Sequence, residues 1–358
     1  MAQHHPIWKT FCRDVDQTLQ DHGMVRNNEA VLIGVSGGPD SIALARVLIC
    51  LAKDRDLRLG LAHLNHGLRG ADGDQDQVFS RKFAAAYNLP FFCDKLNVSA
   101  LAKQDGTSVE EAGRNARYAF FTRTADTGGF TRIATGHTRD DNAEQVLMGL
   151  LRGSGSRGLA GIPPIRENRF IRPLIDRSRR EVLAFLDDLG QAYAVDDSNQ
   201  NHAYLRNRIR GHLIPLLEKE YNPAVKLGLH RLSSILYDED RFMNDHAVQA
   251  YDACVKRKEA DAVFLSIQAV TALHPALVPR VLRHSIQVVK SNLRQITHDH
   301  IRAIQQLLAR AESGRHLDLP GRIRVYKTRH QVCFKKERLP LRQLGWMQKQ
   351  AGHRPRGA

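Results

Sequence analysis

The sequence predicts an α/β fold in which a doubly wound parallel sheet is followed by a helical domain and a small basic C-terminal α+β segment. Between residues 30 and 150, short apolar runs alternate with longer amphipathic stretches, the pattern of strands buried on both faces and covered by helices. After about residue 178 the pattern is mostly helical. Residues 301–358 contain 14 Lys and Arg but only 3 Asp and Glu, so most of the formal net charge of +15 lies near the C-terminal end.

The elements expected in the first part alternate regularly between strand and helix. The strands are expected at 31–35, 59–64, 90–92 and 132–135, with helices at 40–53, 73–88, 107–127 and 140–152. Later helices are expected at 178–189, 204–219, 225–257, 266–290 and 297–311, and short strands at 322–328 and 331–335. Ligands of such sheets bind beyond the carboxyl ends of the strands, where the unusual polar residues of this sequence fall.

The length of 358 residues suffices for two or three domains, each with its own core. We expect domain boundaries near residues 217 and 312, which gives segments 1–217, 218–312 and 313–358. The last segment is expected to contain short strands and to end in a loose tail.

Composition argues against several classes of protein. No apolar run approaches the roughly 18 residues of a membrane span, and the N-terminus lacks a signal peptide, so we expect a cytoplasmic protein without a membrane partner. The five cysteines include no CxxC pair and are typical of free thiols in a reducing compartment. The positive charge favours a polyanionic partner such as nucleic acid, although solubility alone would also account for it.

A glycine-rich heptapeptide, VSGGPDS, follows the first expected strand and precedes a helix. Glycines let the backbone turn sharply and approach a ligand, and the N–H groups of the following helix favour an anion. An acid in such a cradle is explained by a divalent cation that bridges it to phosphates. A turn with a good helix cap is the alternative. The expected ATP-binding residues are Ser36, Gly37, Gly38, Pro39, Asp40 and Ser41.

The second expected strand ends in the polar segment HLNHGLR. His63 and His66 could ligate a metal, or Asn65 and His66 could hydrogen-bond a nucleotide. No third nitrogen or sulfur ligand lies nearby in the sequence, which makes a zinc site improbable. A polar surface loop is the alternative, and Arg69 closes the segment as a candidate substrate contact.

The third expected helix carries Glu110, Arg114, Arg117 and Tyr118. Glu110 and Arg114 share one helical face, as do Arg114 and Tyr118, because each pair is four residues apart. These arginines could bind an anionic substrate with two parallel hydrogen bonds, or they could form surface ion pairs with no function.

Several acids follow the fourth expected strand, in the segment TGHTRDDNAE. Asp140 and Glu144 are one helical turn apart, and Asp141 and Glu144 are three residues apart. Carboxylates at a helix start are stabilised by its dipole and suit Mg²⁺, which prefers oxygen ligands. The alternative is an acidic cap, and His137 precedes the cluster as a candidate catalytic residue.

Basic residues that could contact phosphate follow this helix and recur near residue 206. They are Arg152, Arg206, Asn207, Arg208 and Arg210. The last three arginines cannot all share one helical face, so we expect them to have different partners. A solvated charged helix is the alternative.

Taken together, the motifs SGG-x-DS, HxNHGLR, E-x3-R-x2-RY, H-x2-DD-x2-E, RGSG and RNRIR resemble those of the tRNA(Ile)-lysidine synthetases. These are N-type ATP pyrophosphatases of the PP-loop superfamily, with an adenine nucleotide alpha hydrolase-like domain. The resemblance covers residues 30–217 in order. Thr138 stands where a second histidine is usual in that family.

The resemblance implies a ligase that uses ATP and Mg²⁺ and acts on tRNA(Ile) with a CAU anticodon. ATP adenylates the 2-carbonyl oxygen of the wobble cytidine, and the ε-amine of L-lysine then displaces AMP to give lysidine. The modified base pairs with A instead of G, and charging changes from Met to Ile. A homodimer is plausible for the family, although no segment marks an interface.

The roles expected of the motif residues follow from their chemistry. The glycine loop should hold pyrophosphate, and Asp40 and Asp141 should bind Mg²⁺. Asp140 and Glu144 should hold the lysine ammonium or accept its proton. His137, Arg114 and Arg117 should contact the α-phosphate or the adenylated base, and the segments after 217 should hold the tRNA through its phosphates.

Two other functions fit parts of the sequence. One is a tRNA-thiolating enzyme with the same activated intermediate, which the lack of a CxxC pair argues against. The other is a non-catalytic RNA-binding protein that retains an inactive nucleotide fold.

Overall fold

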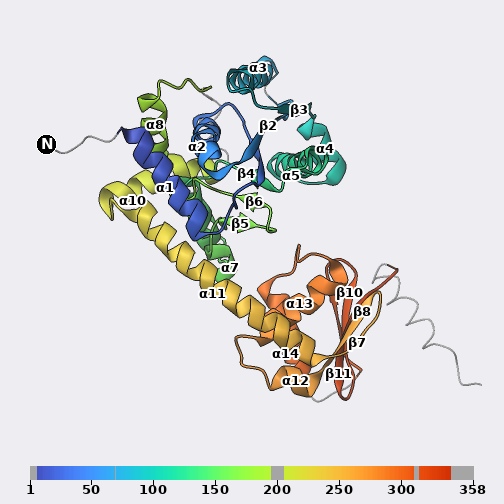
Figure 1. The fold of residues 1–358 in the computed structure, drawn as a ribbon. Helices are drawn as coiled ribbons and strands as arrows, with labels where there is room; N and C mark the ends of the chain where they lie inside the picture. Colours follow the sequence, from blue (N-terminus) through green and yellow to red (C-terminus); the bar gives the residue numbers. More distant parts are fainter. Residues whose placement is uncertain (1–5, 69, 195–204, 310–313, 340–358) are drawn as a thin grey trace, which may run out of the picture. The chain divides into compact units, whose positions relative to one another are not determined.

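A computed structural model describes residues 6–68, 70–194, 205–309 and 314–339 of the chain. It divides the chain into two compact units, residues 1–237 and 238–358 (Figure 1). The first unit is the expected doubly wound α/β domain, and the second combines helices with an antiparallel sheet. The predicted fold class is therefore confirmed.

The first unit is built on a six-stranded sheet with the order β3-β2-β1-β4-β6-β5. Only β5 is antiparallel to its neighbour. The strands are β1 (Ala30–Gly34), β2 (Arg58–Asn65), β3 (Phe91–Lys95), β4 (Arg132–Ala134), β5 (Ile165–Arg166) and β6 (Phe170–Ile171). Strand order reverses between β1 and β4, and such a switch point opens a crevice beyond the strand ends.

Helices cover both faces of this sheet. They are α1 (Ile7–Asp21), α2 (Pro39–Arg55), α3 (Ala71–Ala86), α4 (Val98–Asp105), α5 (Val109–Gly128), α6 (Arg139–Leu151), α7 (Ser156–Leu159) and α8 (Arg179–Asp188). One core joins α1, α2 and α8 to the sheet, and a second core lies under α5. The sequence analysis missed α1, although Phe11, Val15 and Leu19 recur every four residues and are buried.

The predicted helix at 204–219 consists of α9 (Leu205–Arg208), a π-helical turn (η2, Ile209–Leu213) and α10 (Ile214–Glu220). Pro215 explains the irregular turn, because proline lacks the N–H that an α-helix needs at that position. Arg206 and Arg210 both point at helix α6, whereas Arg208 is exposed. The expectation that these arginines have different partners is wrong for Arg206 and Arg210, which bind the same two acids, Asp141 and Glu144.

The second unit is an antiparallel sheet with the order β7-β8-β11-β10-β9, covered by helices. Its elements are β7 (Val255–Lys258), β8 (Ala262–Ser266), α12 (Ile267–Thr271), α13 (Val278–Lys290), α14 (His298–Ala309), β9 (His316–Leu319), β10 (Ile323–Lys327) and β11 (Gln331–Lys336). Helix α11 (Val225–Cys254) leads into it. Among the described residues, no helix combines the length and apolar composition needed to cross a bilayer.

The structure corrects the expected separation of residues 218–312 from residues 313–358. Strand β8 pairs with β11, so one sheet joins the two segments, and one core packs α13 and α14 against it. The sequence analysis missed β7, β8 and β9 because a four-residue apolar run such as 262–265 does not distinguish strand from helix.

Candidate active site

The Ser36–Ser41 loop lies at the carboxyl end of β1 and leads directly into α2. Gly37 has a φ of +88°, a conformation that only glycine adopts easily. The hydroxyl of Ser41 accepts a hydrogen bond from the Ser36 N–H (3.1 Å) and donates one to the Gly38 carbonyl (2.9 Å). The loop is thereby closed on itself, with the N-terminus of a 17-residue helix beneath it. This is a cradle for an oxyanion.

Asp40 is the acid of this loop. Its Oδ2 accepts a hydrogen bond from the guanidinium of Arg179. Its Oδ1 is buried and has no hydrogen-bond partner among the described residues. Burial raises the pKa of Asp40 to about 6, an effect that Arg179 opposes and the nearby Asp141 reinforces. A buried carboxylate oxygen without a partner is stabilised by a cation placed against it.

The loop and the start of α6 lie against each other. A Cβ atom at Gly136 would stand only 3.0 Å from the carbonyl carbon and oxygen of Asp40 and 3.1 Å from the nitrogen of Ser41. Gly136 is followed by the Thr138 cap of α6, so the acids of that helix begin beside the loop. The structure thus brings together the two segments that the sequence analysis placed at neighbouring strand ends.

Asp141 and Glu144 form a cluster with two arginines, Arg206 and Arg210, which we call the acid–arginine cluster. Arg206 donates from Nε to Glu144 (2.7 Å) and from Nη2 to Asp141 (2.8 Å). Arg210 donates from Nε to Glu144 (2.5 Å) and from Nη2 to both acids (3.2 and 3.0 Å). The Glu144 side chain is only 2% exposed. Both acids are therefore neutralised by arginines in this structure.

Thr138 takes the place of the second histidine usual in the resembled family and caps helix α6. Its N–H and hydroxyl donate to Asp141 Oδ2 (2.9 and 3.0 Å), which completes a capping box. Burial would raise the pKa of Asp141, but Arg206 and these contacts hold it below its usual value. Asp141 therefore fixes the start of α6 with one oxygen and faces the arginines with the other.

Asp140 faces a different set of partners. Its Oδ2 accepts from the backbone N–H of Arg179 (2.8 Å), and its Oδ1 pairs with the ammonium of Lys226 (3.0 Å). Lys226 also pairs with Glu218 (3.1 Å). Although burial opposes the charge, these two acids raise the pKa of Lys226. Asp140 therefore joins α6 to α8 and α11.

His137 lies among cations. Its Nδ1 is 3.0 Å from the hydroxyl of Thr135. Burial, with a further contribution from Arg172, lowers the pKa of His137 to about 3. The imidazole is neutral at physiological pH, so it can exchange a hydrogen bond but does not provide a positive charge for phosphate.

Two predicted residues of β2, His63 and Asn65, make contacts outside the acid–arginine cluster. His63 is buried, with Nδ1 3.0 Å from the Val35 carbonyl. Asn65 supports its own loop, since it donates to Asp74 (2.8 Å) and accepts from Gly67 (3.0 Å). Neither contact is to the acid–arginine cluster, so Asn65 has a structural role in this structure.

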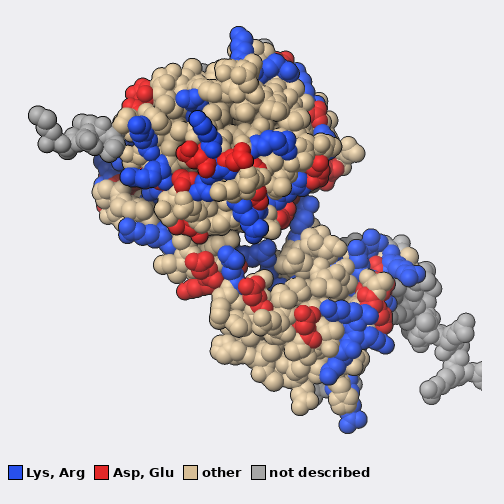
Figure 2. All heavy atoms as spheres, in the orientation of Figure 1, with Lys and Arg blue, Asp and Glu red and all other residues tan. Residues whose placement is uncertain are grey.

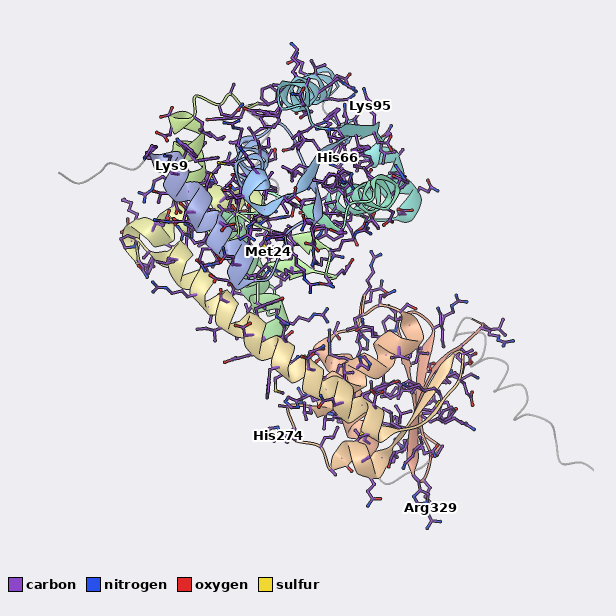
Figure 3. The ribbon with its side chains drawn as sticks, viewed as in Figure 1. Lys9, Met24, His66, Lys95, His274 and Arg329 are labelled. Atoms are coloured by element: carbon purple, nitrogen blue, oxygen red, sulfur yellow. The ribbon has the colours of Figure 1, made fainter. Side chains whose placement is uncertain are left out.

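The end of β2 and helix α5 meet through His66 and Arg117, whose Nε2 and Nη2 are 3.4 Å apart. Figure 3 labels His66 at the carboxyl end of β2. The charge of Arg117 acts on His137, so these residues lie in one neighbourhood. Arg114 instead lies over the ring of Tyr118, 5.7 Å from its centre.

Four further predicted residues lie at exposed or half-buried positions, and a fifth lies outside the described residues. Glu110, Arg152 and Arg208 are exposed, and Asn207 is half-buried. Arg69 lies outside the described residues, as does the segment 196–199.

Three residues that touch this site were not predicted, namely Arg179, Lys226 and Arg172. Arg179 follows Ser178, which caps α8 in a box with Glu181, and this S-x-x-E pattern marks the helix start in the sequence. Arg172 is 2% exposed and donates to Tyr118 (3.4 Å). No local pattern marks Lys226, whose partners come from two other helices.

Acidic and basic side chains alternate over the visible face of the first unit, whereas Lys and Arg gather on the strand side of the second (Figure 2). Among the described residues, no three His, Cys, Asp or Glu side chains converge in a metal-binding arrangement. A cation here would rely on Asp40 together with ligands from a substrate, as is common for Mg²⁺.

Comparisons with known proteins agree with this geometry. The family of the PP-loop domain matches residues 8–217, and that of the TilS substrate binding domain matches residues 265–330. The tRNA(Ile)-lysidine synthase of Geobacter sulfurreducens is 38% identical over 315 residues, which cover 88% of this chain and 66% of the relative. The same-named protein of Caldanaerobacter subterraneus subsp. tengcongensis is 32% identical, over 90% of this chain and 68% of the relative. The chain thus spans about two thirds of their length.

One solved structure has a fold similar to that of this chain over about two thirds of its length. It is the U34-tRNA thiolase NcsA from Methanococcus maripaludis with its 4Fe–4S cluster, at a TM-score of 0.54 and 24% identity, over 65% of this chain and 80% of that one. At this identity the likeness supports the fold alone.

Proposed function

Because this chain belongs to the tRNA(Ile)-lysidine synthase family, we propose that it is a ligase that joins L-lysine to the wobble cytidine of tRNA(Ile) at the expense of ATP. The observation that supports this proposal is the contact of Gly136 with the backbone of Asp40 and Ser41. It places an oxyanion cradle beside acids and arginines at one switch point of the sheet. Nucleotidyl transfer needs this combination of anion binding and charge stabilisation.

The glycine loop is proposed to bind the phosphates of ATP. The Ser36 and Ser41 hydroxyls, 3.3 Å apart, and the N-terminus of α2 provide its polar surface. The Oδ1 of Asp40, which has no partner in the part of the chain that the structure describes, fits a magnesium ion, which would neutralise the phosphates and the leaving pyrophosphate. Asp141 was also expected to bind Mg²⁺, but its oxygens are occupied by Thr138 and the arginines here. We therefore propose Asp40 as the principal ligand.

The acid–arginine cluster is proposed to bind the reacting groups. Each guanidinium has five N–H donors, and Arg206 directs only part of them at Asp141 and Glu144. The remaining donors can hold the α-phosphate or the activated base, while the neutral His137 exchanges a hydrogen bond with the base. The base must leave its stack to reach these residues.

Binding of the lysine substrate requires an acid for its ammonium group and a base for its proton. Asp140 already holds an ammonium, that of Lys226, and Glu144 holds two guanidiniums. An incoming lysine therefore competes with groups of the chain itself. We propose Glu144 as the acid that orients the lysine amine, since its cluster also contains Asp141, a neighbour of Asp40. Asp140 is proposed to position α6.

The raised pKa of Asp40 predicts how binding of magnesium and ATP depends on pH. The carboxylate that binds the cation is present above the folded pKa of about 6 and is lost as the pH falls through it. Affinity for Mg²⁺·ATP, measured by calorimetry, is expected to fall about tenfold between pH 7 and pH 5. The nucleotide titrates in the same range, so Asp40→Asn serves as the control. An equal fall in that variant would contradict the assignment.

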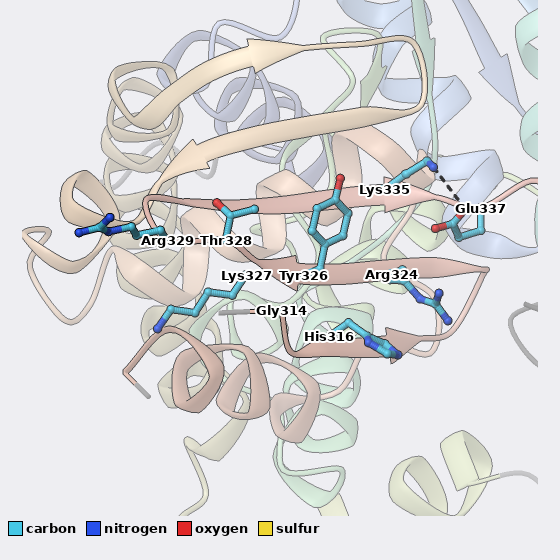
Figure 4. A pocket seen from close by; sticks show the side chains of 9 residues that line it. All are labelled: Gly314, His316, Arg324, Tyr326, Lys327, Thr328, Arg329, Lys335 and Glu337. Carbon is cyan, nitrogen blue, oxygen red and sulfur yellow. Dashed lines mark ion pairs between the residues drawn. The ribbon is translucent and has the colours of Figure 1, made fainter. Parts of the chain in front are cut away.

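The second unit is proposed to hold the tRNA through the open face of its sheet. Helices α13 and α14 cover one face, and on the other a cavity of about 560 Å³ is lined by residues of β9, β10 and β11 (Figure 4). Arg324 pairs with both carboxylate oxygens of Asp318 (2.8 and 3.1 Å). Arg329 and His316 are exposed to solvent. A basic, shallow surface of this kind suits the phosphates of an RNA helix.

Charge reversal on this face is expected to weaken RNA binding. Arg329 stands at the turn between β10 and β11 (Figure 3). The Arg329→Glu variant should bind the tRNA about tenfold more weakly at low salt and with a smaller salt slope. Arg302→Glu, an exposed position on α14, is the matched control. Equal affinities of the two variants would argue against this face. Deletion of residues 301–358 is less informative, because β9 to β11 complete the core.

Incubation with ATP, Mg²⁺, radiolabelled lysine and total tRNA, followed by nucleoside analysis, tests the proposed activity. Lysidine that appears only when ATP is present supports it, and unlabelled nucleosides together with intact ATP would refute it. The thiolating and non-catalytic alternatives have no specific observation in their favour. Sulfur incorporation, or RNA binding without ATP–pyrophosphate exchange, would identify them.

A further inference from the structure

Cys12 and Cys50 meet outside the site described above, between helices α1 and α2. The two helices pack against each other, and the two cysteines line the same cavity, where Cys50 acts on the Cys12 thiol. Both are free cysteines, 38 positions apart in the sequence. The fold, not the local sequence, therefore creates a pair of adjacent thiols.

The surroundings of the two thiols differ. Cys12 is 5% exposed, whereas Cys50 is exposed to solvent. Both line a cavity of about 240 Å³, whose other walls are mainly the apolar side chains of Trp8, Phe185 and Leu189. A small reagent can therefore reach Cys50 more easily than Cys12.

A positive charge lies beside the pair. Arg46 lines the same cavity and acts electrostatically on Cys12. Its guanidinium is held over the ring of Tyr87, 4.7 Å from the ring centre, and donates to the Tyr87 hydroxyl. Burial raises the pKa of the Cys12 thiol, an effect that Arg46 opposes. The solvent-exposed Cys50 is therefore the thiol that a reagent meets, and the buried Cys12 is suited to act second.

We propose that Cys12 and Cys50 form a redox modification site that low-molecular-weight disulfides convert to an intramolecular disulfide. The Cys50 thiolate attacks one sulfur of the reagent, which gives a mixed disulfide and releases one thiol after protonation. The Cys12 thiol loses its proton to water, attacks the Cys50 sulfur and expels the second thiol. Two electrons pass from the cysteine pair to the reagent disulfide.

The bond would join α1 to the helix that begins at the glycine loop. Cys50 lies three helical turns beyond Pro39, about 16 Å along α2 at 1.5 Å per residue. Phe11, next to Cys12, stacks on Phe185 of α8 with ring centres 4.4 Å apart. Oxidation would therefore fix α1, α2 and α8 as one body without touching a residue assigned to substrate.

The test treats the full chain with oxidised glutathione and maps its peptides without reduction. We expect the Cys12 and Cys50 peptides to be joined by a disulfide. The joined species should have the summed mass of the two reduced peptides minus two hydrogens, and dithiothreitol should separate them. This pairing should exceed all others about tenfold, because thiols held close together have a high effective concentration.

Variants make the test specific. Cys50→Ser should leave Cys12 unmodified, since the attacking thiol is gone, and Cys12→Ala should stop at the mixed disulfide on Cys50. Cys93→Ser is the matched control, because Cys93 is an exposed cysteine that contacts Arg81 at 3.2 Å and lies on β3. It should retain the Cys12–Cys50 bond. If the Cys12→Ala variant does not fold, the peptide map of the wild-type protein and the Cys50→Ser variant still test whether the Cys12–Cys50 disulfide forms.

Two outcomes would overturn the proposal. One is a wild-type protein in which Cys50 carries glutathione and Cys12 stays a free thiol. The other is cross-linking that involves Cys93, Cys254 or Cys333 as often as the proposed pair. The readout is the state of the cysteines, so it does not depend on the proposed ligase activity.

Discussion

Replacement of Asp40 by alanine is expected to abolish lysidine formation and to leave tRNA binding nearly unchanged. Arg179 pairs with Oδ2 of Asp40, whereas the buried Oδ1, at the edge of the glycine loop, has no partner among the described residues and is suited to a bound cation. Without it, the charge that develops on the leaving pyrophosphate is not neutralised. A loss of about a thousandfold or more, roughly 4 kcal/mol of transition-state stabilisation, is expected.

Single-turnover formation of lysidine and the Kd for tRNA, measured on the same preparations, separate the two effects. Asp40→Asn has the shape of the native side chain and tests the charge alone. Asp54→Asn is the matched control, since Asp54 is exposed on the same helix. Normal turnover in Asp40→Ala would refute the metal-binding role, and an equal loss in Asp54→Asn would show a general effect on α2.

The parts of the site that the sequence predicts are those encoded by consecutive residues. Glycines between a buried strand and a helix specify the loop, since the required φ at Gly37 restricts the residue type. Acids behind a threonine cap specify the start of α6. The alternation of strands and helices then places both segments at one edge of the sheet.

The partners of these acids could not be predicted, because they come from distant parts of the chain. Arg179 reaches Asp40 across 139 positions, and Lys226 reaches Asp140 from α11. A carboxylate looks the same in the sequence whether a metal, a substrate or an arginine neutralises it. The sequence analysis therefore assigned Asp140 to the substrate, although the chain's own lysine occupies it here.

The second unit illustrates the same limit at the level of the fold. The apolar run of strand β8 lies between two expected helices, 225–257 and 266–290, and was assigned to no element; its pairing with β7 and β11 shows it to be a strand. The domain boundary expected at 312 followed instead from the basic charge of the C-terminal residues and from the short strand-like runs that begin there. Long-range pairing, which decides between strand and helix for short apolar runs, leaves no local trace.

Replacement of Glu144 by glutamine is expected to impair both stability and turnover. The carboxylate is 2% exposed and accepts from both Arg206 and Arg210, so its loss leaves two guanidiniums that share only Asp141. Breaking a fully buried pair costs about 3–5 kcal/mol. The side chains of Arg206 and Arg210 are 36% and 45% exposed and can regain water, which reduces the expected cost to about 2 kcal/mol.

Thermal unfolding should show this loss as a fall in Tm of about 4–8 °C for a unit of this size. Lysidine formation should fall about a hundredfold, because the amine loses the acid proposed to orient it. Glu220→Gln, at an exposed position on α10, is the matched control and should change neither quantity.

A double variant distinguishes charge pairing from a general defect of packing. In Glu144→Gln with Arg210→Gln, the second change removes one guanidinium that the first left without its buried partner. The free energy of unfolding should therefore fall by less than the sum of the two single changes, with a coupling of about 1 kcal/mol or more. Additive losses would mean that Glu144 is not the centre of the cluster. Turnover should stay low in the double variant, because restored charge balance does not replace the acid that orients lysine.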